Sequence, residues 1–84
     1  MKSNLDMYKV IEEIIEKLEI NHESQWSLKL KYAMYSDSTS GEILGKIRCA
    51  LHELQTTDLP EKLKFEDDIR NSLSFIDSLL GPDH

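Results

Sequence analysis

The stretch Thr39–Leu54, TSGEILGKIRCALHEL, combines a helix start signal with a helical pattern of apolar residues. Thr39 and Glu42 have the spacing of a capping box, in which each side chain accepts a hydrogen bond from the backbone amide of the other residue. The apolar residues that follow share one helical stripe: Ile43, Leu44, Ile47, Ala50, Leu51 and Leu54. This spacing predicts an amphipathic helix that ends near Gln55.

The polar residues just before this helix, Ser36 to Gly41, raise the question of a phosphate-binding loop. A Walker-type loop needs the pattern GxxxxGK[ST] after a strand, and this segment contains a single glycine. Its serine, threonine and aspartate side chains compete for nearby backbone groups and therefore favour turns. The segment is predicted to be a hinge between two pairs of helices.

Two segments near the ends of the chain also show helical periodicity. The first runs from about Ser3 to Glu19, and Ser3 and Asp6 resemble a capping pair. The last begins near Asp58 and Glu61 with Pro60 in its first turn, and it ends at Gly81-Pro82, which is a strong helix stop. The apolar residues of this last helix are Leu63, Phe65, Ile69, Leu73, Ile76, Leu79 and Leu80.

The segment from His22 to Tyr35, for which Asn21 is the predicted N-cap, carries two apolar stripes. Trp26, Leu30 and Ala33 form one stripe, and the other stripe consists of Leu28, Tyr32 and Tyr35. The letters WSLKLKY also alternate, so a short strand within residues 26–35 is an alternative. A helix is favoured because no partner strand is visible elsewhere in the chain.

These segments predict an all-α fold, a compact antiparallel bundle of about four helices. The chain has 84 residues, enough for one small domain that spans residues 1–84. Short polar turns between the helices favour antiparallel neighbours.

The charge of the chain limits the classes of partner. Sixteen acidic residues against ten basic ones give a net charge of −6, which repels nucleic acids and anionic lipids and attracts basic proteins. A surface that is acidic only for solubility is the alternative. The N-terminal residues lack the apolar core of a signal peptide, and no apolar run is long enough for a membrane span. We expect a cytoplasmic protein.

Residues that could carry chemistry are few. Cys49 is the only cysteine, and with His52 it would supply just two of the four ligands of a closed metal site. The carboxylates Glu12, Glu13 and Glu16, and later Glu66, Asp67 and Asp68, occupy polar faces opposite the apolar stripes. We therefore expect no catalytic residue, no bound metal and no cofactor, and hence no enzyme.

A basic zone on the middle helices leaves DNA binding as a lesser alternative. It consists of Lys29, Lys31, Lys46 and Arg48. The last helix, where a recognition element would be expected, carries acidic residues that would face phosphates. We expect no nucleic-acid partner.

The aromatic residues of the second helix point to protein binding instead. Trp26, Tyr32 and Tyr35 span more than half of the helix circumference, so at least one should be exposed. Exposed aromatic residues often supply the central contacts of protein interfaces, and carboxylates accelerate the encounter with a basic partner. The residues predicted to bind a protein partner are Glu12, Glu13, Glu16, Tyr32, Tyr35, Glu66 and Asp67.

Several features of the chain are those of a known type of protein. The segment Trp26–Leu54, with its W-x-x-x-L pattern, the hinge SDSTSGEIL and the letters IRCALHEL, resembles the small acidic helical immunity proteins of bacterial polymorphic-toxin and contact-dependent inhibition systems. The resemblance implies stoichiometric neutralisation of a toxin domain, often a basic nuclease, by occlusion of its active site.

A second class of function fits the same residues. The apolar excess of the second helix could pack against its copy in a homodimeric adaptor or regulatory protein, so the chain is expected to be a monomer or a homodimer.

Overall fold

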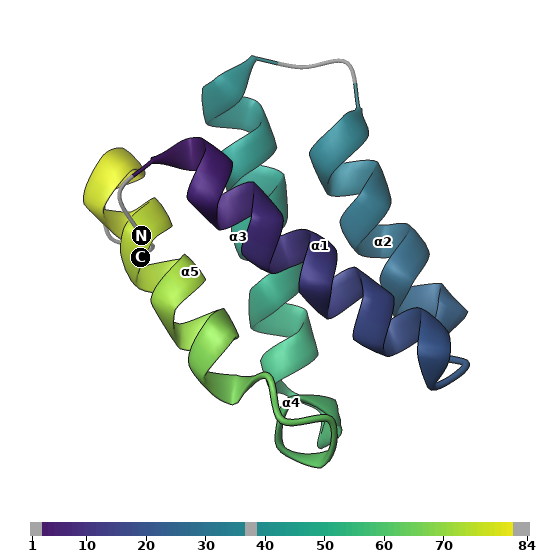
Figure 1. The fold of residues 1–84 in the computed structure, drawn as a ribbon. Helices are drawn as coiled ribbons and strands as arrows, with labels where there is room; N and C mark the ends of the chain where they lie inside the picture. Colours follow the sequence, from purple (N-terminus) through teal and green to yellow (C-terminus); the bar gives the residue numbers. More distant parts are fainter. Residues whose placement is uncertain (1–2, 37–38, 82–84) are drawn as a thin grey trace.

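The computed structural model describes residues 3–36 and 39–81, and these residues form five helices (Figure 1). In chain order they are α1 (Asn4–Ile20), α2 (Ser24–Tyr35), α3 (Ser40–Gln55), α4 (Leu59–Lys62) and α5 (Glu66–Leu80). The described residues contain no strand. The predicted all-α class is confirmed, and residues 26–35 lie in a helix. The antiparallel bundle of about four helices is not confirmed, because the described residues form five helices.

Two of the predicted capping residues, Ser3 and Thr39, begin α1 and α3. Ser3 Oγ accepts a hydrogen bond of 3.3 Å from the amide of Asp6, and Thr39 Oγ1 accepts one of 3.4 Å from the amide of Glu42. Each bond satisfies an amide that has no partner within its helix. The segment before α3 is therefore a connection with a helix cap, as predicted, although Asp37 and Ser38 lie outside the described residues.

The prediction for Asn21 is wrong. Asn21 ends α1, where its side-chain amide donates a 2.8 Å hydrogen bond to the carbonyl of Lys17. The chain then turns through His22, which has a positive φ of 62°, and Glu23 is the N-cap of α2. An asparagine side chain serves either end of a helix, so its type alone does not distinguish a start from a stop.

The predicted last helix is interrupted. It breaks into α4 and α5 at Leu63–Phe65, where Lys64 has a φ of 62°. The amide of Phe65 donates a 2.9 Å hydrogen bond to the carbonyl of Pro60, which closes the turn. Phe65 is then buried beneath the helices with 1% of its surface exposed. Burial of a phenylalanine outweighs the cost of a single left-handed residue.

The hydrophobic core is shared by α1, α2, α3 and α5, and α1 and α3 each contact both α2 and α5. Within the described residues, α2 and α5 do not contact each other, and they lie on opposite sides of the molecule (Figure 1). Among the described helices, α2 therefore packs only against α1 and α3, and none of these helices covers its remaining face. None of the helices in the described ranges has the length and apolar character to cross a membrane.

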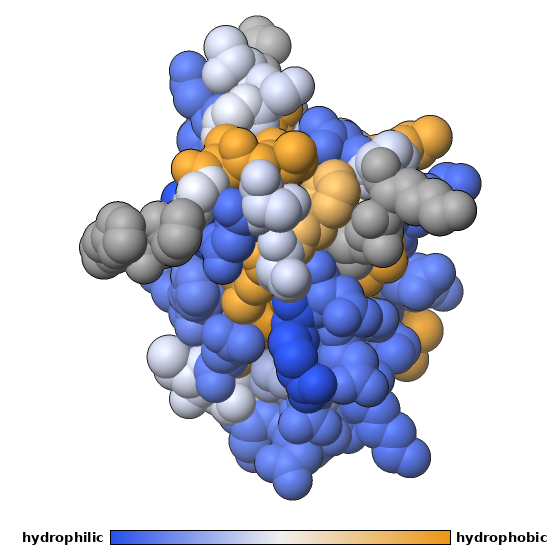
Figure 2. All heavy atoms as spheres, turned by 90° about the vertical axis from the view of Figure 1, so that its left-hand side faces the viewer, coloured by the Kyte–Doolittle hydropathy of each residue, from blue (hydrophilic) through white to orange (hydrophobic). Residues whose placement is uncertain are grey.

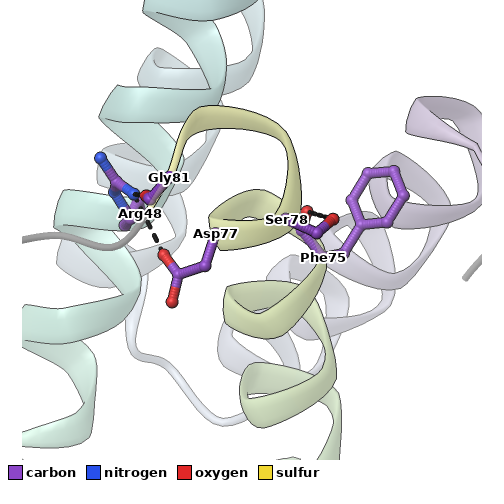
Figure 3. Close-up of polar contacts among 5 residues, drawn as sticks. All are labelled: Arg48, Phe75, Asp77, Ser78 and Gly81. Carbon is purple, nitrogen blue, oxygen red and sulfur yellow. Dashed lines mark hydrogen bonds and ion pairs between the residues drawn. The ribbon is translucent and has the colours of Figure 1, made fainter.

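Arg48 ties α3 to the end of α5 (Figure 3). Its guanidinium donates a 3.0 Å hydrogen bond to Asp77 Oδ1 and a 2.7 Å hydrogen bond to the carbonyl of Gly81. Gly81 ends α5 with a φ of 86°, which glycine adopts readily. The predicted stop is confirmed at Gly81, whereas Pro82 lies outside the described residues.

Candidate protein-interaction surface

Helix α2 carries apolar residues on two opposite faces. Leu30 and Ala33 are buried in the core, and Trp26 is half-buried against it. Leu28, Tyr32 and Tyr35 form the outer face of α2, where they are 62%, 71% and 66% exposed. Their spacing of four and three residues places them along one stripe. The expectation that the aromatic residues of this helix cannot all be buried is confirmed.

A shallow depression marks the outer face of α2. All of its lining residues belong to α2 or to Ser36, the residue that follows the helix. The lining includes Lys29 and Lys31 and no carboxylate, although the chain as a whole is acidic. Among the described residues, Glu12 and Glu19 bring carboxylates to this surface from α1.

Two contacts join the outer face of α2 to α1. The hydroxyl of Tyr35 donates a 3.2 Å hydrogen bond to Glu12 Oε1, and Lys31 Nζ lies 2.6 Å from Glu19 Oε2. Glu16 is exposed one helical turn beyond Glu12 on α1, and it extends the acidic border of the surface.

The environment of Tyr35 raises the pKa of its hydroxyl above the usual 10.0. Partial desolvation is the main cause, followed by the charge of Glu12 and by the hydrogen bond to this carboxylate. The positive charge of Lys31 acts in the opposite direction. The phenol therefore stays protonated at neutral pH and remains a donor to Glu12.

The contacts on the other side of α2 connect it to α3. Lys29 forms an ion pair with Glu53, and its ammonium lies 5.2 Å from the ring centre of Trp26. Lys46 of α3 lies 5.5 Å from the ring centre of Tyr32 and donates a 3.1 Å hydrogen bond to Ser36 Oγ. Tyr32 thus leans towards α3, whereas Tyr35 leans towards α1.

The structure brings together some of the residues predicted to bind a partner. Glu12 contacts Tyr35, and Tyr32 lies one turn before Tyr35 on the same face. Glu13 and Glu16 are exposed on α1.

The other two predicted binding residues lie elsewhere. Glu66 and Asp67 are in the first turn of α5, which does not contact α2 within the described ranges, and Asp67 pairs with Arg70 at 3.1 Å. The side of the molecule on which α5 lies is mainly hydrophilic, with hydrophobic patches in its upper part, near its middle and along its right edge (Figure 2). The two acidic regions are therefore separate surfaces.

Sequence reasoning missed the surroundings of the tyrosines. The predicted site does not include Leu28, although this residue is nearly as exposed as Tyr32 and Tyr35 on the same stripe. Lys29, Lys31 and Lys46 frame the tyrosines, while Arg48 of the predicted basic zone points to Asp77 and Gly81 instead. The three-to-four spacing of Leu28, Tyr32 and Tyr35 was the available signal for the stripe.

Cys49 and His52, the residues of the chain suited to metal or nucleophile chemistry, are not part of a larger cluster within the described residues. Cys49 and His52 are both exposed on α3. Within residues 3–36 and 39–81, no group of three or more histidine, cysteine, aspartate or glutamate side chains could hold a metal ion.

No protein-family model, curated protein or solved structure matches the chain.

Proposed function

We propose that this protein is an immunity protein that binds a basic toxin domain and blocks the active site of that domain by occlusion. The binding surface is the edge at which α1 meets α2. The observation that carries the proposal is the hydrogen bond between Tyr35 and Glu12, because it joins an exposed aromatic stripe to an exposed acidic border.

The chemistry of this edge suits a basic partner. Tyr35 offers a large, rigid contact area with a polar tip, which is typical of residues at the centre of interfaces. Glu12 and Glu16 offer carboxylates to arginine or lysine side chains of the partner. The net charge of −6 adds long-range attraction that accelerates encounter.

The first test is co-expression with the product of the adjacent gene, since an immunity gene is expected beside the gene of its toxin. The expected result is a neighbour that is toxic alone, is harmless together with this protein, and co-purifies with it. A neighbour that is harmless alone, or that remains toxic in the presence of this protein, would contradict the proposal.

The second test locates the surface by binding kinetics. Tyr35→Ala is expected to weaken binding by roughly thirtyfold, as for a central interface tyrosine. Glu12→Lys/Glu16→Lys is expected to slow association and to speed dissociation, because it reverses charges in contact with the partner.

A matched charge reversal on α5 serves as the comparison. Glu66→Lys/Asp67→Lys makes the same change in net charge on a helix that does not touch α2. It is expected to slow association only, through the loss of long-range attraction. Faster dissociation of this variant would extend the contact surface to α5, and unchanged dissociation of the α1 variant would remove the α1–α2 edge from it.

A further inference from the structure

A groove between α2 and α3 lies beside the edge described above and has a different character. Its volume is about 260 Å³, and its lining is mainly apolar. Ala33 and Ala50 are nearly buried and form the floor, while Lys46, Cys49 and Glu53 line the α3 side. The small alanine side chains leave the groove open, and the 71% exposed Tyr32 stands at its border.

The charged residues that line the groove differ in balance from those of the whole chain. Its lining residues carry two lysines and one glutamate, whereas the chain has a net charge of −6. The described lining residues therefore lack the acidic excess of the whole chain. At this face, two copies of the chain can approach without the repulsion that their total charge implies.

Lys46 and Glu53 give the face a self-complementary pattern. Both side chains point towards α2, because Lys46 contacts Ser36 and Glu53 pairs with Lys29. They lie seven residues apart on α3, which is two helical turns or roughly 10 Å. A two-fold axis that passes midway between them, at the level of Cys49 and Ala50, reverses the direction of α3. It places Lys46 of each copy opposite Glu53 of the other copy, so the interface contains this pair of residues twice.

We infer that the α2–α3 face binds a second copy of the chain in a two-fold, antiparallel arrangement. Tyr32 and Leu28 of each copy supply the apolar centre, the alanine-floored groove receives the tyrosine of the other copy, and two Lys46–Glu53 pairs flank this centre. Glu12 and Glu19 of α1 lie on the opposite border of α2, so repulsion between them favours contact over α3.

The size of the face predicts a weak dimer. Helices of 12 and 16 residues present an area on the order of 500 Å² per copy, near the lower limit of specific interfaces. Self-association is therefore expected to depend on concentration. This inference does not depend on the proposed function, and its variants leave Glu12, Glu16 and Tyr35 unchanged.

Sedimentation velocity over a series of protein concentrations tests the inference, in a reducing buffer so that Cys49 cannot cross-link the chains. The wild type is expected to shift from monomer to dimer. Lys46→Glu and Glu53→Lys should each weaken the dimer about tenfold, since each change affects two ion pairs. The double variant Lys46→Glu/Glu53→Lys restores opposite charges and should recover most of the loss. Tyr32→Ala should abolish the dimer.

Control variants carry the same charge changes at exposed positions outside the face. Lys9→Glu on α1 and Glu61→Lys on α4 should leave the association unchanged. Circular dichroism checks that every variant is folded. A wild type that stays monomeric at every concentration would overturn the inference, and so would a dimer that the charge swap fails to restore. A monomer that binds another protein through Lys46 and Tyr32 would assign the face to that protein instead.

Discussion

At the scale of single residues, Tyr35 offers a direct readout of the α1–α2 contact. Glu12→Gln removes the negative charge beside the phenol, so the pKa of Tyr35 should fall towards its usual value. Lys31→Met should shift the pKa in the opposite direction, because it removes a nearby positive charge. NMR titration of the assigned tyrosine measures both shifts. Equal values in wild type and Glu12→Gln would show that the hydrogen bond is absent in solution.

The raised pKa of Tyr35 also determines whether the free energy of unfolding rises or falls with pH. Since the unfolded chain has the usual pKa of 10.0, unfolded Tyr35 loses its proton first as the pH rises. The free energy of unfolding should therefore decrease above pH 10, and it should decrease less steeply in Glu12→Gln than in the wild type. Parallel urea titrations of the two proteins test this difference, and identical slopes against pH would contradict it.

Ser72 places a buried hydroxyl in the core without a hydrogen-bond partner. Its side chain is fully buried in α5, and its hydroxyl has no hydrogen-bond partner. Ser72→Ala removes this buried polar group and adds helix propensity, so the free energy of unfolding should rise by about 1 kcal/mol. Two controls separate the causes: Ser74→Ala is exposed on the same helix, and Ser27→Ala removes a buried hydroxyl that donates to the carbonyl of Ser24. Chemical denaturation should rank Ser72→Ala above both.

At the scale of elements, the sequence predicted the helices better than their junctions. The helices α1 and α3 could be predicted because their apolar stripes and their caps at Ser3 and Thr39 are local patterns. The residues of each pattern are brought together by the turns of one helix, without contacts to distant parts of the chain. The break before α5 was not predictable in this way. It depends on the burial of Phe65 beneath distant helices, and the apolar spacing of residues 63–80 is the same whether or not the helix is continuous.

The two sharp junctions make a prediction about stability. His22 and Lys64 adopt a φ of 62° between helices, a conformation that is costly for residues with a β-carbon. His22→Gly and Lys64→Gly should each raise the free energy of unfolding by up to about 1 kcal/mol, after the greater entropy of glycine in the unfolded chain is subtracted. Lys9→Gly, in the middle of α1, should lower it by about 1 kcal/mol. Thermal unfolding measures all three, and destabilisation by both junction variants would exclude left-handed strain there.

At the scale of the whole molecule, the candidate surface was only partly predictable. The apolar stripe of α2 could be predicted, because it follows from the spacing of Leu28, Tyr32 and Tyr35. The partners of that stripe do not follow from spacing, because Glu12, Lys46 and Glu53 reach it from helices that are distant in sequence. Which face of α2 is uncovered depends on where α1 and α3 pack, and this arrangement is a property of the assembled core.

The contact of Arg48 with α5 belongs to the same scale, since it joins residues that are 29 and 33 positions apart. The arginine side chain is 16% exposed and bonds both Asp77 and the carbonyl of Gly81. Arg48→Met should therefore lower the free energy of unfolding by about 2 kcal/mol, because it leaves two acceptors without their donor. Asp77→Asn should cost about 1 kcal/mol or less, since this carboxylate is 41% exposed and solvent screens its charge.

A double-mutant cycle separates the two bonds of Arg48. The difference between Arg48→Met/Asp77→Ala and Asp77→Ala isolates what Arg48 contributes through Gly81, the residue that ends α5, because alanine, unlike asparagine, offers Arg48 no side-chain acceptor. Arg70→Met is the matched control, because Arg70 and Asp67 form a pair that is largely exposed within a single helix, and its loss should change stability by less than about 0.5 kcal/mol. If Arg48→Met/Asp77→Ala is no less stable than Asp77→Ala, the carbonyl contact adds nothing to stability, and the end of α5 is held by its apolar packing alone.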